Sequence, residues 1–192
     1  MGVVHVESLF EGSRLKDLNG EVIPGEEVAA SDIYKDAPTV VVVIRRPGCV
    51  ACRDTAQKLW ARKSDFDDLG VQMVAVVHQG FPGEIKRFKA GYWPGSVFLD
   101  SEKKFYETVG EGKVRVGSLR WLLNPFSRAW RNIRAAIRGG VSGNFAGDGT
   151  TLGGLLVLAA GGGIEYAFQE TDFGDAAPVE DVLAAAKRAA GK

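Results

Sequence analysis

Three apolar runs, separated by amphipathic segments, dominate the first half of the chain. The run Thr39–Ile44 reads TVVVVI and residues 71–77 read VQMVAVV, which is typical of strands buried on both faces of a sheet. A shorter run, SVFLD, follows at residues 96–100. Apolar positions at helical spacing predict helices over residues 49 to about 63 and again after Pro82. This alternation predicts an α/β fold with parallel strands.

Two hairpins are expected, one near each end of the chain. Residues 15–28 read LKDLNGEVIPGEEV, and the Asn19-Gly20 pair within them suits a tight turn. Residues 154–170 hold two apolar runs, GLLVLAA and IEYAFQE, around a GGG turn. After them, Pro178 followed by carboxylates predicts the start of a final helix.

A helical, glycine-rich insertion is expected over residues 101–150, before the second hairpin. Asn124 and Pro125 are suited to begin its helix, and Gly139-Gly140 to end it. One face of that helix carries Phe126, Trp130, Ile133 and Ile137. We expect this face to pack into the body of the protein and the arginines between to be solvated.

Length and charge favour a single soluble domain over residues 1–192. The 192 residues carry 24 basic and 24 acidic side chains and are 45% hydrophobic, so neither disorder nor a generally nucleic-acid-binding surface is indicated. The longest apolar stretch, residues 152–164, is shorter than the roughly 20 residues needed to cross a bilayer. No targeting signal is recognised in the first ten residues.

The only two cysteines, Cys49 and Cys52, follow the first buried run in the stretch VVVVIRRPGCVACRD. So close a pair does not cross-link a secreted scaffold, so we expect a cytoplasmic, reducing location. Zinc needs four ligands, and His5 and His78 are not spaced as a second half-site. A buried core pair is the plainer alternative. The position at a strand-to-helix turn favours redox chemistry instead.

The helix N-terminus that begins at Cys49 would stabilise a thiolate, and Arg45 and Arg46 would add to the positive field. Cys49 is then the candidate nucleophile, attacking a disulfide sulfur or a peroxide oxygen, and Cys52 resolves the product. An external dithiol must reduce the pair again. Thr55, one turn further on, is a candidate for orienting substrate or tuning Cys52.

Two further features could take part in function. Residues 113–138 contain seven basic residues, no acidic residue and several aromatic ones, which would suit an anionic surface or an acidic partner. His78 stands at the expected carboxyl end of a strand, where it could donate a proton or simply lie in a surface loop.

The segment RRPGCVACRDTAQKL resembles the peroxiredoxin-like 2 group of the alkyl hydroperoxide reductase and thiol-specific antioxidant superfamily, which includes prostamide/prostaglandin F synthase. The resemblance continues through LGVQMVAVV, SVFLDSEKKFYE, FSRAW, GGVSGNFAGDGTTLGGLLVL and FGD. It implies a thioredoxin-like α/β/α sandwich with no tightly bound cofactor. It also implies thiol-dependent reduction of a peroxide or endoperoxide, with Pro47 and Gly48 shaping the turn.

Electrons would then come from an external thiol system, that of thioredoxin or glutathione, and ultimately from NADPH. The sequence departs from related families at two places. Arg46 occupies the place, three residues before Cys49, where ordinary peroxiredoxins have Thr or Ser, and residues 151–154 lack the proline that precedes this strand in thioredoxins. A protein-disulfide reductase and a non-enzymatic redox-sensing module are the alternative functions.

Overall fold

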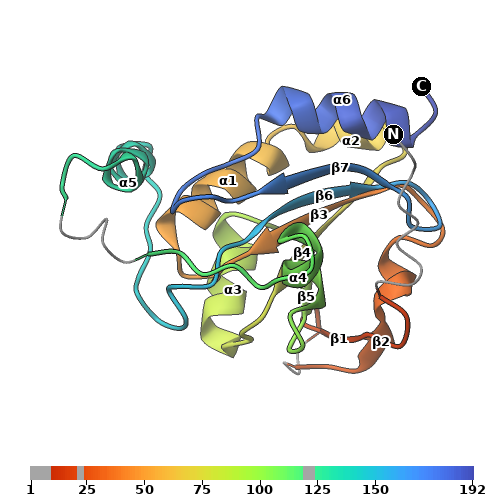
Figure 1. Ribbon diagram of the computed structural model, residues 1–192, viewed down its shortest axis with the longest axis horizontal. Coiled ribbons are helices and arrows are strands. Elements are labelled where there is room, and N and C mark those ends of the chain that lie inside the picture. The colour runs from red at the N-terminus through yellow and green to blue at the C-terminus, as the bar shows by residue number, and fades with distance from the viewer. Residues whose placement is uncertain (1–9, 21–23, 119–123) are drawn as a thin grey trace.

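The computed structural model describes residues 10–20, 24–118 and 124–192, and these form one mixed sheet of seven strands with helices on both faces (Figure 1). The strand order is β2-β1-β5-β4-β3-β6-β7. The strands are β1 Arg14–Asp17, β2 Glu27–Ala29, β3 Thr39–Ile44, β4 Gln72–Val77, β5 Ser96–Leu99, β6 Gly154–Leu158 and β7 Ile164–Gln169.

The centre of the sheet confirms the predicted parallel strands. β4 pairs in parallel with both β3 and β5, while β6 runs antiparallel to β3 on its other side. Along β3, Val40 and Val42 contribute to one hydrophobic core, and Val41 and Val43 to the other. Because each face of the sheet is covered, the strand carries apolar side chains at every position from Val40 to Ile44.

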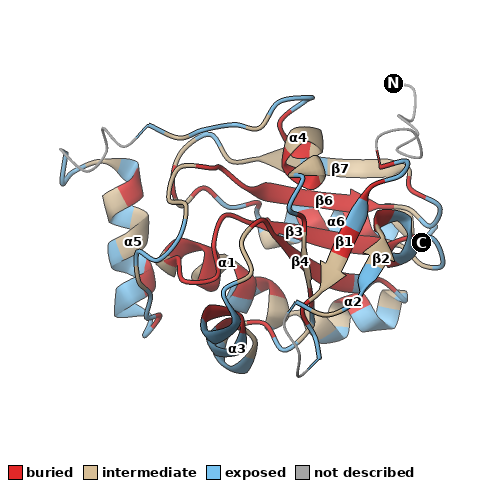
Figure 2. Cartoon of the chain, turned by 90° about the horizontal axis from the view of Figure 1, so that it is seen from below, coloured by how far each residue is buried: buried red, intermediate tan, exposed pale blue. Residues whose placement is uncertain are grey.

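The helices form the outer two layers of an α/β/α sandwich, as predicted. One face is covered by α1 Val50–Trp60, α2 Lys63–Leu69, α3 Pro82–Gly91 and α6 Val179–Ala189. The other is covered by α4 Lys104–Val109 and the short 3-10 helix η2 Ala30–Ile33. Figure 2 shows the central strands as the most continuously buried part of the chain.

The helix α5, Arg128–Arg138, lies at the margin of the molecule beyond α1 (Figures 1 and 2). It begins later than the sequence suggested. The hydroxyl of Ser127 caps it by accepting the N–H of Trp130, whereas the Asn124 side chain accepts the N–H of Phe126 in the turn before. A second helix in the same region, α4, was not predicted. The carboxylate of Asp100 supports it by accepting the N–H of Phe105.

The N-terminal hairpin has the expected strands but not the expected tight turn at Asn19-Gly20. Lys16 pairs with Glu27, so residues 18–26 connect β1 to β2. The Asn19 side chain instead accepts the N–H of Val97, which fastens this connection to β5. The C-terminal hairpin of β6 and β7 and the helix α6 are both confirmed.

We expect Leu156→Ala, in the middle of β6, to lower the free energy of unfolding by about 2–5 kcal/mol, since the side chain is completely buried and its loss leaves a cavity. Urea denaturation followed by circular dichroism measures this cost. Phe126→Ala is the control, because Phe126 is 91% exposed and should change stability by less than about 0.5 kcal/mol. Equal losses in the two variants would contradict the assignment of β6 to the core.

Candidate active site

Cys49 occupies the N-cap position of α1, directly after the turn that follows β3. Its sulfur accepts the backbone N–H of Cys52 at 3.4 Å and an N–H of the Arg45 guanidinium at 2.8 Å. Both cysteines are free thiols and both are buried. A helix N-terminus and a buried cation thus converge on one sulfur, which is the arrangement that stabilises a thiolate.

The two thiols are driven to opposite protonation states. Hydrogen bonding from Cys52, together with the charge and hydrogen bond of Arg45, lowers the pKa of Cys49 well below its ordinary value in spite of burial. The hydrogen bond with Cys49 and burial raise the pKa of Cys52 well above it. These opposite shifts favour a thiolate on Cys49 and a protonated thiol on Cys52, which are the states that the roles expected from the sequence require.

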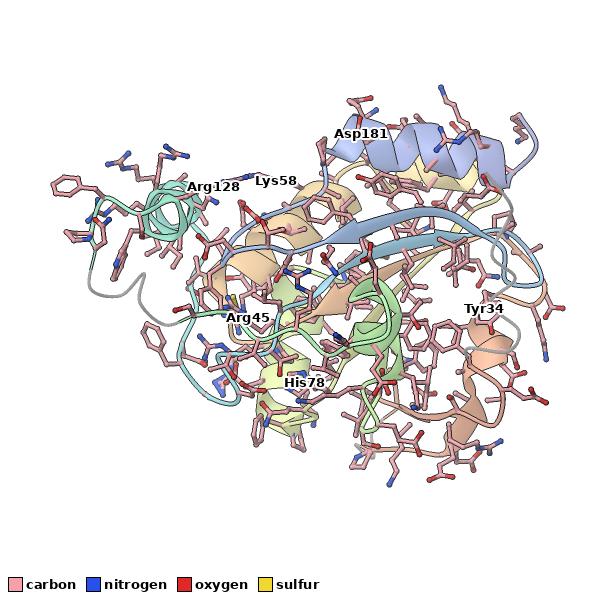
Figure 3. The ribbon with its side chains drawn as sticks, viewed as in Figure 1. Tyr34, Arg45, Lys58, His78, Arg128 and Asp181 are labelled. Atoms are coloured by element: carbon pink, nitrogen blue, oxygen red, sulfur yellow. The ribbon has the colours of Figure 1, made fainter. Side chains whose placement is uncertain are left out.

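Arg45 is held in place by residues from distant parts of the chain. Its guanidinium lies over the ring of Phe173, 4.4 Å from the centroid, and donates to the carbonyl of Gly149 at 3.3 Å. Figure 3 shows Arg45 directed into the interior near the start of α1. Glu170 is a second ionisable group in the region. Burial raises the pKa of its carboxyl to about 7, although Arg45 opposes the shift.

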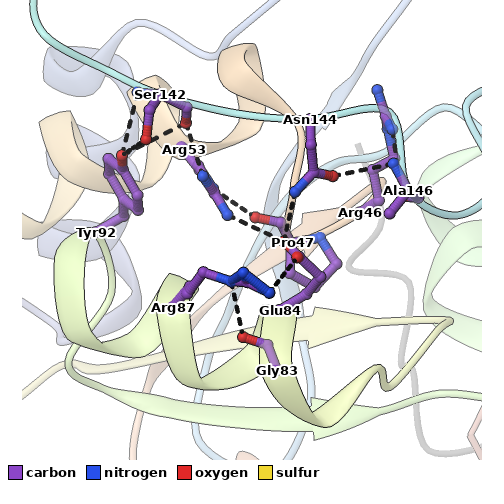
Figure 4. A network of polar contacts seen from close by, with 10 residues as sticks. All are labelled: Arg46, Pro47, Arg53, Gly83, Glu84, Arg87, Tyr92, Ser142, Asn144 and Ala146. Atoms are coloured by element: carbon purple, nitrogen blue, oxygen red, sulfur yellow. Dashed lines mark hydrogen bonds and ion pairs between the residues drawn. The ribbon is translucent and has the colours of Figure 1, made fainter.

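The turn that carries Cys49 is braced by the segment at residues 142–146 (Figure 4). The N–H of Asn144 donates to the carbonyl of Gly48 at 2.8 Å. A Cβ atom on Gly48 would lie 2.3 Å from the Asn144 side-chain oxygen, so a larger residue would displace the Asn144 side chain. The buried Arg53 donates to the carbonyls of Pro47 and Ser142, both at 2.7 Å, and pairs with Glu84 at 3.2 Å.

A cavity of about 680 Å³ opens onto Cys49. Its lining is mostly apolar and includes Trp130, Ile133 and Ile137 of α5, and Arg45 and Arg46 line it as well. Cys52 does not line it. The cavity therefore gives a ligand access to the thiolate while its partner thiol lies behind.

The remaining candidates from the sequence have other surroundings. Arg46 lines the cavity but donates to the carbonyl of Ala146 at 3.2 Å. Thr55 is outside the cavity, and its hydroxyl donates to the carbonyl of Ala51. His78 is also outside it, with Nε2 3.3 Å from a carboxylate oxygen of Asp148. His5 lies outside the described residues.

Sequence reasoning missed Arg53, Glu84, Asn144 and Phe173, whose contacts hold the Cys49 turn and Arg45. Apart from the bond between Arg53 and Pro47, these contacts join segments tens of residues apart, and each residue alone is typical of a helix face or a loop. The crowding at Gly48 likewise arises only because the Asn144 side chain packs against it in the folded structure.

A sheet with parallel central strands and a Cys-X-X-Cys pair at the first turn of the following helix is the arrangement of thioredoxin-like folds. Residues 58–172 match the family model described as AhpC/TSA antioxidant enzyme, a range that begins after the cysteines. Peroxiredoxin-like 2A from Xenopus tropicalis is 38% identical over 180 residues, covering 93% of this chain and 75% of that protein. The human Peroxiredoxin-like 2A is 38% identical over 159 residues, covering 82% and 66%. The chain therefore belongs to the peroxiredoxin-like 2 family.

Solved structures agree on the fold. The Xanthomonas campestris bacterioferritin comigratory protein, studied for alkyl peroxide reduction, superposes with a TM-score of 0.63 at 12% identity, covering 98% of this chain and 99% of that one. Peroxidoxin BcpB of Mycobacterium tuberculosis gives 0.57 at 13% identity, covering 92% and 91%. Family membership supports thiol-dependent oxidoreductase activity of the peroxidase type.

We expect Arg45→Gln to raise the pKa of Cys49, because the substitution removes the cation from the sulfur. Alkylation of Cys49 by iodoacetamide at about pH 7 should then slow several-fold, and its rate should rise with pH over a higher range than in the unmodified protein. Arg46→Gln is the matched control, since Arg46 is hydrogen-bonded to Ala146 instead. Identical pH profiles for Arg45→Gln and the unmodified protein would contradict the assignment.

Glu84→Ala should lower the free energy of unfolding by about 3–5 kcal/mol, because it leaves the charge of Arg53 buried without its partner. Glu107→Ala breaks an exposed pair with Lys104 and should cost less than about 1 kcal/mol. Thermal and urea denaturation of both variants measure the difference. Similar small losses of unfolding free energy in both variants would show that the Arg53–Glu84 pair contributes little to stability.

Proposed function

We propose that this protein reduces an apolar peroxide or endoperoxide through a dithiol cycle of Cys49 and Cys52. The observation that carries the proposal is that Cys49, whose sulfur accepts a hydrogen bond from Arg45, lines a mostly apolar cavity of about 680 Å³. Such a cavity suits an organic peroxide better than hydrogen peroxide, because apolar walls stabilise a bound hydrocarbon and offer water-like ligands few partners.

The first step is attack of the Cys49 thiolate on one peroxide oxygen. The O–O bond breaks and the electron pair leaves with the second oxygen, which takes up a proton. A hydroperoxide that is attacked at its terminal oxygen yields an alcohol and the sulfenic acid of Cys49. The charge of Arg45, 2.8 Å from the sulfur, favours both the thiolate and the developing negative charge on the leaving oxygen.

In the second step, the sulfur of Cys52 attacks the Cys49 sulfenic sulfur, water leaves and the disulfide forms. An endoperoxide keeps both oxygens, so the first intermediate carries its alkoxy group on Cys49, and attack by Cys52 releases a diol. Both routes consume two electrons and two protons. An external dithiol, of the thioredoxin or glutathione system in a reducing compartment, restores the pair by thiol–disulfide exchange.

A small substrate is favoured over a protein disulfide by the way Cys49 is enclosed. The residue is only 3% exposed and is reached through the cavity beside α5. Thioredoxin-type exchange with a folded protein requires a more accessible attacking sulfur. Exchange with the reductant then needs the cavity to open or the disulfide to become exposed after oxidation.

We expect Cys49→Ser to abolish consumption of cumene hydroperoxide, with turnover supported by a thioredoxin system falling at least about 1000-fold. Cys52→Ser should stop the cycle after about one equivalent of peroxide and leave a dimedone-reactive sulfenic acid on Cys49. The unmodified protein should consume cumene hydroperoxide faster than it reduces insulin disulfides. Undiminished peroxide turnover by Cys49→Ser, or faster insulin reduction, would refute the proposal.

A further inference from the structure

The helix α5 carries three stripes of side chains with different chemistry. The stripe that meets the body consists of small and polar residues. Ala129 and Ala136 are buried, and the side-chain amide of Asn132 donates to the carbonyl of Gly174 at 2.9 Å. The helix packs against α1 and lies at the edge of the molecule in both views (Figures 1 and 2).

The bulky apolar stripe is not packed into the core, contrary to the expectation from the sequence. Trp130, Ile133 and Ile137 line the cavity above Cys49, and Ile137 remains 54% exposed. Phe126, just before the helix, is 91% exposed. Large apolar side chains left in water in this way mark a surface that contacts a partner or a membrane.

The third stripe is basic and faces solvent. Arg131, Arg134 and Arg138 are exposed and, together with Pro125 and Phe126, line a hollow of about 220 Å³. None of these three arginines forms an ion pair with a carboxylate among the residues that the structure describes. The sequence contains no Asp or Glu from residue 113 to residue 147. These arginines are therefore free to contact an anion from outside the chain.

We propose that α5, together with Phe126, docks the protein on the surface of an anionic phospholipid bilayer. Arginines beside exposed aromatic and aliphatic residues are the composition with which amphipathic helices bind such surfaces, the cations contacting headgroup phosphates and the apolar residues entering the acyl boundary. A soluble acidic protein is the alternative partner, but the exposed Phe126 among the arginines better matches a bilayer, which offers phosphates and acyl chains side by side.

Docking by α5 also connects the bilayer to the cavity. Ile137 is both exposed and part of the cavity wall, so the helix surface that meets the lipid continues into the space above Cys49. The peroxidised acyl chains of a membrane are then within reach as substrates. This consequence rests on the proposed function, whereas the docking itself does not.

Sedimentation with vesicles tests the docking without peroxide or reductant, so that its outcome is independent of catalysis. The full chain should bind vesicles of phosphatidylcholine with about one third phosphatidylserine, and bind pure phosphatidylcholine vesicles far more weakly. Binding should weaken when NaCl is raised from about 0.1 M to 0.5 M, because salt screens the arginines. Equal binding to both kinds of vesicle, or binding to neither, would overturn the proposal.

Neutralising the basic stripe should remove the binding. The triple variant Arg131→Gln, Arg134→Gln and Arg138→Gln is expected to bind the anionic vesicles roughly 100-fold more weakly. The matched control neutralises three exposed basic residues on other helices, Lys86→Gln, Lys187→Gln and Arg188→Gln, and should bind as the unmodified protein does. Equal losses in the two variants would show that only net charge matters and would refute a docking role for α5.

The variant Phe126→Ser tests how much an apolar side chain contributes to vesicle binding, independently of the arginines. It leaves every arginine in place and should weaken vesicle binding by about tenfold, with an unchanged circular dichroism melting curve. Analytical ultracentrifugation without lipid tests the alternative, that a second copy of this chain covers the surface of α5 and Phe126. A dimer that dissociates in the Phe126→Ser variant, without vesicle binding by the unmodified protein, would overturn the assignment to a bilayer.

Discussion

The contact between the Arg45 guanidinium and the Cys49 sulfur is the interaction on which the site depends. A buried thiolate is costly in free energy unless a charge and hydrogen bonds compensate for the lost water. Here the cation is itself buried, lying on the ring of Phe173, so that its field is little screened. Burial of both groups therefore strengthens the attraction between them, and the pKa values of the two cysteines shift in opposite directions.

Much of the surrounding structure holds this pair of residues in position. The parallel strands β3 and β4 place the turn at the carboxyl edge of the sheet, where α/β folds form their sites. Arg53, Glu84 and Asn144 then fix the turn to the segment at residues 142–146, which is also a wall of the cavity. The Cys49 turn and the cavity wall are thus held by one polar network, and the loss of one of its contacts would alter both.

The helix α5 shows that apolar residues at helical spacing need not pack into the core. Its apolar residues have helical spacing, which favours packing into a core, yet the helix contacts the body through Ala129, Asn132 and Ala136. Small side chains allow a close approach to α1 and leave Trp130 and Ile133 beside the cavity. Amphipathic spacing indicates only that some face is apolar. What covers that face depends on which stripe fits the neighbouring helix.

The local pattern of the sequence determined the buried strands, the helices that follow them and the Cys-X-X-Cys pair, because hydrophobic period, turn residues and helix ends act over a few neighbouring positions. It also indicated Arg45 and Arg46 as cations near the thiols. Only the tertiary structure decided that Arg45 contacts the sulfur while Arg46 bonds to Ala146, and that Thr55 and His78 lie outside the cavity. The Arg53–Glu84 brace and the cavity wall were decided there too, since they join segments whose proximity arises only when the sheet assembles.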